Sequence, residues 1–201
     1  MQETYSKHAS QYAAAYELAS PEEVHASWLH LIPKARSRVL DVGAGSGRDA
    51  AWLASKGHHV TAVEPSKAMR ETARKLHPDS SVRWINDALP ALDTVHALKI
   101  KFDLILANAV WIHVSPPDRT RAMASLASLL EDNGVLIITL RHGPSPDKRI
   151  MHDCSEKELA RLAQSQGLEI ILQAAMADAL GRKEVTWTHM AFIPRADIHE
   201  K

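Results

Sequence analysis

The chain has 201 residues, of which 45% are apolar and 24% are charged. Both values are ordinary for a globular protein, and the length suits a single domain (residues 1–201) with a sizeable core. Lysine plus arginine and aspartate plus glutamate number 24 each, which argues against a nucleic-acid partner, because proteins that bind a phosphate backbone usually carry a basic surplus.

At the start of the chain, residues 1–6 have neither the basic nor the apolar segment of a secretory signal. No apolar run further along approaches the roughly 20 residues needed to cross a bilayer. Cys154 is the single cysteine, which excludes an internal disulfide and fits a reducing compartment. We therefore expect a cytoplasmic globular protein, monomeric or homodimeric, without a membrane partner.

Before residue 36 the sequence predicts helices that lie outside the main pattern. Ser20 has the features of a helix start, with proline at the next position and Glu23 three residues after the cap. The apolar residues that follow keep to one face and predict a helix as far as Ile32. We expect residues 1–35 to form a helical cap or lid, with Tyr12 in a position to close over a site.

From residue 38 onwards short apolar runs alternate with amphipathic segments. This alternation predicts a parallel sheet with helices on both faces. The predicted strands are 38–42, 59–63, 81–85, 102–107, 135–140, 168–172 and 185–193. The helices expected between them are 48–55, 66–76, one that opens at Ser115 and is ended by Asn133-Gly134, and 155–167. The fold class is therefore α/β, with an open, doubly wound, seven-stranded sheet.

The first strand leads into a glycine turn, and residues 39–47 read VLDVGAGSG. Glycines at such a turn let the backbone approach a ligand closely, and in an open α/β sheet ligands bind beyond the carboxyl ends of the strands. The glycines alone also fit a dinucleotide site. Asp41, two residues before the first glycine, would repel a pyrophosphate but tolerate a cationic group. Glu64 ends the next strand, where an acid can bind ribose hydroxyls.

Residues 36–194 resemble the class I S-adenosylmethionine (SAM)-dependent methyltransferases. The matching segments are 39–47, 62–66 (AVEPS), 86–88 (NDA), 102–108 (FDLILAN) and 129–136 (LLEDNGVL). The resemblance implies a Rossmann-like sheet in the order 3-2-1-4-5-7-6 with the last strand antiparallel. It also implies SAM as cofactor and S-adenosyl-L-homocysteine as product. The cofactor residues that it implies are Asp41, Gly43, Ala44, Gly45, Arg48, Glu64, Pro65, Met69, Asp87, Ala88, Asn108 and Ala109.

The loop after the fourth strand narrows the choice of methyl acceptor. Residues 108–111 read NAVW and lack the two prolines of enzymes that methylate exocyclic amines in DNA. Cys154 follows an aspartate, so the Pro-Cys nucleophile of cytosine-carbon methyltransferases is missing. The 12 histidines show no zinc spacing, and we expect no metal. An O, N or S atom of a small molecule is the acceptor that remains. An RNA or protein substrate, a SAM-binding module without catalysis and a dehydrogenase stay open as alternatives.

Four residues are candidates for the acceptor side of the site. His113 is the candidate general base, because an imidazole titrates near neutrality; the alternative is a cap for the helix that opens at Ser115. Arg141 suits an anionic acceptor, or else a salt bridge at the rim of the sheet. Trp111 is expected to form a wall of the pocket, and Tyr12 to belong to the lid.

Overall fold

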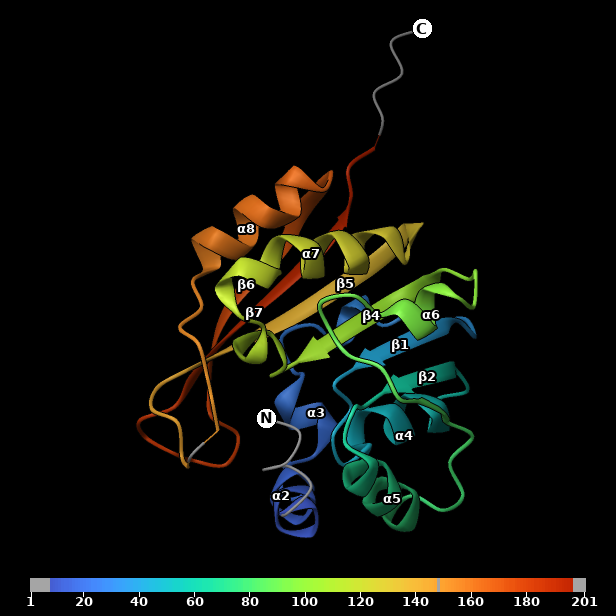
Figure 1. Cartoon of the computed structure of the whole chain (residues 1–201), viewed down its shortest axis with the longest axis vertical. Coiled ribbons are helices and arrows are strands. Elements are labelled where there is room, and N and C mark those ends of the chain that lie inside the picture. The colour runs from blue at the N-terminus through green and yellow to red at the C-terminus, as the bar shows by residue number, and fades with distance from the viewer. Residues whose placement is uncertain (1–7, 148, 197–201) are drawn as a thin grey trace, which may run out of the picture.

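The computed structural model describes residues 8–147 and 149–196, and it contains one seven-stranded sheet with helices on both faces (Figure 1). The strand order is β3-β2-β1-β4-β5-β7-β6. All neighbouring pairs are parallel except those of β7, which runs antiparallel to both β5 and β6. The strands are β1 Arg38–Val42, β2 His59–Val63, β3 Arg83–Ile85, β4 Phe102–Asn108, β5 Leu130–His142, β6 Leu168–Ala177 and β7 Thr186–Pro194. The predicted sheet order is confirmed.

The helices cover the two faces of the sheet unequally. They are α2 Ala9–Tyr16, α3 Pro21–Val24, α4 Arg48–Ser55, α5 Lys67–Leu76, α6 Asp93–His96, α7 Arg119–Ser128 and α8 Glu156–Ser165, with short 3-10 turns at Leu29–Leu31, Trp111–His113 and Pro116–Asp118. Apolar residues of α6, α7 and α8 share one core with the sheet, and α4 packs into a second core on the opposite face. No helix within the described ranges is both long and apolar enough to cross a membrane.

The central strands β1 and β2 are buried from their second residue onward because both of their faces are covered. In β1, Leu40 and Val42 point into the core beneath α7 and α8, whereas Val39 points into the core beneath α4. A parallel strand between two helical layers has no wet face, which explains the continuous apolar runs of the sequence. Asp41 breaks this run although it is only 2% exposed.

The predicted helix from Ser20 to Ile32 is wrong beyond its first turn. The expected capping box is present, because Ser20 Oγ accepts the Glu23 amide at 3.2 Å and Glu23 Oε2 accepts the Ser20 amide at 3.0 Å. However, α3 ends at Val24, and the chain turns so that Trp28 becomes fully buried in the core beneath α4. Tertiary packing of this large side chain overrides the helical periodicity.

A second correction concerns Asn133-Gly134, which does not end a helix. Helix α7 ends at Ser128, and residues 130–134 already belong to β5. The pairing of β4 with β5 shifts between Phe102 and Leu104, so the intervening residues of β5 form a bulge. Gly134 lies in this bulge, where an added Cβ would come within 3 Å of the Phe102 carbonyl oxygen. The glycine therefore marks a close backbone approach inside a strand.

The N-terminal helix α2 lies beside α5, at the edge of the sheet where the parallel strands end (Figure 1). Ala9, Ala13 and Met69 are buried against one another, with Tyr12 and Tyr16 packed around them. Small alanines on α2 allow this close approach to Met69 on α5. The helix thus brings two tyrosines to the carboxyl edge of the sheet.

Candidate functional site

The glycine turn joins β1 to α4 and is anchored on the neighbouring strand. Its three glycines all have positive φ: 72° at Gly43, 55° at Gly45 and 81° at Gly47. The amides of Gly43 and Ala44 both donate to the Val63 carbonyl at the end of β2, at 2.8 and 2.9 Å. A Cβ on Gly43 would lie 2.7 Å from a Val110 methyl group. Only glycine therefore fits this backbone and this packing.

Glu64 lies directly after β2 and beneath the turn. Its Oε2 accepts the Gly45 amide at 3.1 Å, and its Oε1 accepts the Ser66 amide at 2.8 Å. Burial raises the pKa of Glu64, and the two amide hydrogen bonds partly offset this effect. Each carboxylate oxygen can accept more than one hydrogen bond. The side chain can therefore bind hydroxyl groups while it holds the turn.

Asp41 is a buried carboxyl group with an unsatisfied oxygen. It is 2% exposed, and its Oδ2 has no hydrogen-bond partner among the described residues. Burial raises the pKa of Asp41 well above its usual range, and the charges of Asp49 and Glu64 act in the same direction, against that of Arg48. Buried polar atoms are nearly always paired in native proteins. This oxygen is thus a place where a cationic ligand group would complete the structure.

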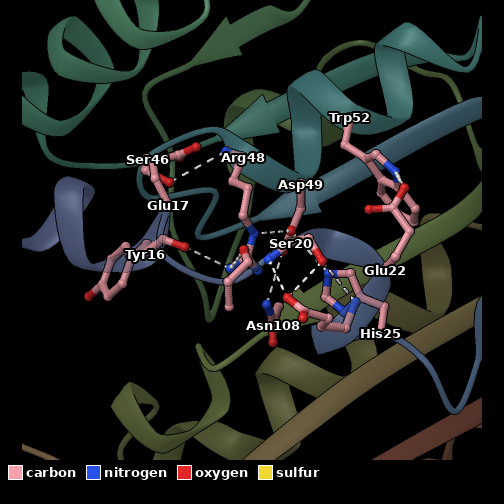
Figure 2. A network of polar contacts seen from close by, with 12 residues as sticks. Tyr16, Glu17, Ser20, Glu22, His25, Ser46, Arg48, Asp49, Trp52 and Asn108 are labelled. Atoms are coloured by element: carbon pink, nitrogen blue, oxygen red, sulfur yellow. Dashed lines mark hydrogen bonds and ion pairs between the residues drawn. The ribbon is translucent and has the colours of Figure 1, made fainter. Parts of the chain in front are cut away.

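Asp49, in the first turn of α4, is the centre of a buried polar network (Figure 2). Its Oδ1 lies 2.8 Å from Arg48 Nε and 3.0 Å from His25 Nε2, and its Oδ2 accepts Asn108 Nδ2 at 3.0 Å. The His25 contact has the distance of an ion pair but not the alignment of a hydrogen bond. Burial would raise the pKa of Asp49, but the contacts of its carboxylate with His25 and Arg48 lower it strongly.

Two residues predicted to bind the cofactor are engaged within the protein. Arg48 Nη1 donates to the Tyr16 carbonyl at 2.8 Å, so its guanidinium attaches the N-terminal segment to the turn. Asn108 Oδ1 accepts the hydroxyl of Thr139 at 2.7 Å, and that hydroxyl oxygen accepts the Ala109 amide at 2.9 Å. These contacts fix the ends of β4 and β5 beside α4. Cofactor contacts by these side chains stay a prediction.

Asp87, expected to bind an adenine amine, has a structural role as well. Its Oδ1 accepts the Ala88 amide at 2.8 Å, and its Oδ2 accepts the amides of Thr94 and Val95 at 2.7 and 3.0 Å. The carboxylate therefore caps the start of α6, where the backbone amides of a helix lack internal partners. The role of Asp87 toward adenine stays a prediction.

The N-terminal helix and the loop after β5 meet over the glycine turn. The Tyr16 ring lies 3.5 Å from the Cβ position of Gly45. Arg149 Nη1 donates to the Tyr16 hydroxyl at 3.0 Å, and the hydroxyl of Tyr12 donates to Asp147 Oδ2 at 2.9 Å. Two segments far apart in the sequence thus lie together beside the turn, and a lid role for residues 1–35 stays a prediction.

His113 follows β4 and is held by a loop carbonyl. Its Nδ1 lies 3.0 Å from the Ile150 carbonyl oxygen, which can only accept, so Nδ1 carries the proton. Burial lowers the pKa of His113, although the bond to Ile150 opposes this effect. The ring is then neutral at neutral pH, with Nε2 in the lone-pair form that a general base needs.

The remaining acceptor-side candidates have different surroundings. Trp111 is 1% exposed and packs in the core beneath α7 and α8, and its role as a wall of the acceptor pocket stays a prediction. Arg141 lies near the end of β5, half-buried. A groove of about 620 Å³ lies between β5, β6, β7 and the start of α8, and none of the predicted site residues lines it.

Part of the chain is similar in sequence to known proteins. Residues 39–134 match the family described as "Methyltransferase domain". An uncharacterized methyltransferase of Mycobacterium tuberculosis is 28% identical over 122 residues, which are 61% of this chain and 59% of the relative. One from Staphylococcus carnosus is 31% identical over 108 residues, 54% of this chain and 49% of the relative. The chain thus spans less than two thirds of these relatives.

Solved structures share the fold over nearly the whole chain. One is the 1,6-didemethyltoxoflavin-N1-methyltransferase of Burkholderia thailandensis, solved with bound 1,6-didemethyltoxoflavin and S-adenosylhomocysteine. It superposes with a TM-score of 0.74 at 20% sequence identity, and the match covers 96% of this chain and 87% of the other. A TehB-like SAM-dependent methyltransferase of Corynebacterium glutamicum has a TM-score of 0.64 at 20% identity, with 96% and 98% covered. The chain has the class I methyltransferase fold.

Proposed function

We propose that this protein transfers a methyl group from SAM to an O, N or S atom of a small molecule. The observation that carries the proposal is the unpaired, buried Oδ2 of Asp41 beside the glycine turn. SAM carries an ammonium and a sulfonium, cationic groups that this oxygen suits, and a ribose, which Glu64 suits. A pyrophosphate would meet two buried carboxyl groups, Asp41 and Glu64, at the same place, and their ionised forms would repel it.

Isothermal titration calorimetry tests the cofactor half of the proposal. We expect the purified protein to bind SAM and S-adenosylhomocysteine and to bind NADH more weakly. The same measurement on Glu64→Gln should give a dissociation constant for SAM about tenfold higher, because a neutral amide replaces a charged acceptor. The exposed Asp79→Asn variant is the control and should bind as the wild type does. Preferential binding of NADH would contradict the proposal.

The residues after β4 and β5 would then face the acceptor. When bound, SAM supplies a sulfonium methyl group, which passes to an acceptor lone pair while the sulfur keeps the electron pair of the broken bond. The protein contributes alignment and exclusion of water. Tyr16 and Arg149, which meet over the turn, suit the second role. Where the acceptor atom carries a proton, His113 Nε2 accepts it.

Replacing His113 with glutamine should lower kcat about 100-fold, because positioned general bases contribute at least this factor. The wild-type rate should fall as the pH decreases through the pKa of His113, which lies below the ordinary value of 6.5, since protonation removes the base. The variant should lack this decrease. His96→Gln, on an exposed histidine, is the control. An unchanged kcat with the acid limb retained would limit His113 to a structural role through its contact with the Ile150 carbonyl.

A further inference from the structure

Arg141 is a half-buried arginine near the end of β5 that has no carboxylate partner among the described residues. Its Nη1 donates to the Gly143 carbonyl at 3.0 Å and lies 3.8 Å from Met151 Sδ. Within the described residues, no carboxylate oxygen comes within 4.0 Å of its guanidinium. Arg149 and Arg182, by contrast, are paired with Asp147 and Asp178 at 2.9 and 2.6 Å.

The register of the sheet places Arg141 next to the donor site. Asn108 at the end of β4 is paired with Thr139 of β5. Arg141 follows two residues later, so it lies on the same face as Thr139, roughly 6.6 Å further toward the carboxyl edge. The Thr139 hydroxyl contacts both Asn108 and the amide of Ala109. Arg141 therefore stands beside the loop whose Val110 touches Gly43 of the glycine turn.

The carboxylates of Asp147 and Asp178, near Arg141, are already paired with Arg149 and Arg182. Met151, the loop partner of Arg141, lies two residues from Arg149, which contacts Tyr16 over the glycine turn. On the β7 side, Arg141 lies opposite Trp187 in the pairing of β5 with β7. The Nε1 of Trp187 donates to Asp178, which also forms the ion pair with Arg182. Burial lowers the pKa of Arg141, and the positive charges of Arg182 and Arg149 lower it further. The negative charges of Asp178 and Glu184 oppose this effect and are weaker.

We propose that the methyl acceptor is an anion, a carboxylate or a phosphate ester, and that Arg141 binds its charged group. This inference rests on the proposed function and names the substrate class of the same site. A planar guanidinium forms two parallel hydrogen bonds with either anion. It would hold the acceptor by its charged end at the end of β5 and leave the nucleophilic atom directed toward β4, where His113 and the donor site lie.

The test uses labelled SAM and a small-molecule extract of the source cells, divided by an anion-exchange column into retained and unretained fractions. We expect labelled product from the retained fraction. Treatment of that fraction with phosphatase distinguishes the two anions, because loss of the product identifies a phosphate ester and persistence a carboxylate. Product formed only from the unretained fraction would overturn the proposal. If SAM binds but neither fraction is labelled, methyl transfer itself is contradicted, and the anion proposal with it.

The second part of the test assays variants of Arg141 with the fraction that yields labelled product. Arg141→Gln should raise KM about 10- to 100-fold, the range for losing a hydrogen bond to a charged group, and should leave SAM affinity in calorimetry unchanged. Arg141→Lys should recover part of the loss, because it restores the charge without the planar fork. Raising the salt concentration from about 50 to about 500 mM should raise KM for the wild type but not for Arg141→Gln.

Arg161, exposed on α8, gives the matched control, and Arg161→Gln should behave as the wild type does. Equal changes in KM for Arg141→Gln and Arg161→Gln would overturn the assignment of Arg141. A parallel loss of SAM affinity in Arg141→Gln would do so too, because it would show a structural effect on the donor site.

Discussion

Replacing Asp49 with alanine should lower the free energy of unfolding by about 3–5 kcal/mol, the usual cost of breaking a buried ion pair from one side. The carboxylate is 9% exposed, and it contacts Arg48, Asn108 and a fully buried His25. Without it, the His25 ring and the Arg48 guanidinium would keep their buried positions and lose their charged partner. Equilibrium urea unfolding followed by circular dichroism measures the change.

Asp49→Asn retains an oxygen acceptor and should lose less stability than Asp49→Ala, whereas the exposed Asp79→Ala should stay within about 0.5 kcal/mol of the wild type. The pKa of Asp49 lies below its unfolded value of about 3.9. Its stabilising contribution is therefore complete above that pH and is lost as the pH falls through the folded-state pKa. The wild type should lose stability in acid more steeply than Asp49→Ala does. Equal acid sensitivity would show that the network does not stabilise the fold.

The strands and the cofactor side of the site follow from local signals in the sequence. Parallel strands buried on both faces are continuous apolar runs, and their carboxyl ends meet at one edge of the sheet. Asp41, the glycine turn and Glu64 can therefore be predicted from the sequence to lie together. Ser66 and Ser155 accept the amides three residues ahead, as their capping sequences indicate.

The parts that the sequence did not reveal depend on contacts between distant segments. His25 reaches Asp49 because the chain leaves the helical path after Val24 and buries Trp28. No periodicity marks this turn, since the same residues also fit one helical face. The sequence itself offers only a histidine close to the capping box as a signal. The contact of Tyr16 with Arg149 joins residues 133 positions apart, and no local pattern specifies such a pair.

Replacing Asp41 with asparagine should change stability and cofactor binding in opposite directions. In the folded protein the pKa of Asp41 is raised by burial and by the charge of Asp49. The contribution of such a group is present below the unfolded pKa of about 3.9 and is lost as the pH rises through the folded-state pKa. Asparagine stays neutral, so Asp41→Asn should gain about 1–2 kcal/mol at alkaline pH, the cost of a buried group without a partner.

SAM binding should weaken in the same variant by about 2–5 kcal/mol, the cost of removing one partner of a buried charge pair. A cationic ligand group beside Asp41 favours its ionised form, so binding should release a proton, and wild-type affinity should rise with pH until Asp41 is ionised in the free protein. Asp41→Asn should lack this dependence. Thermal unfolding measures the first effect, and calorimetry over a pH series measures the second. A variant that loses stability and affinity together would show that Asp41 only supports the turn, whereas opposite changes place the cationic end of the cofactor at Oδ2.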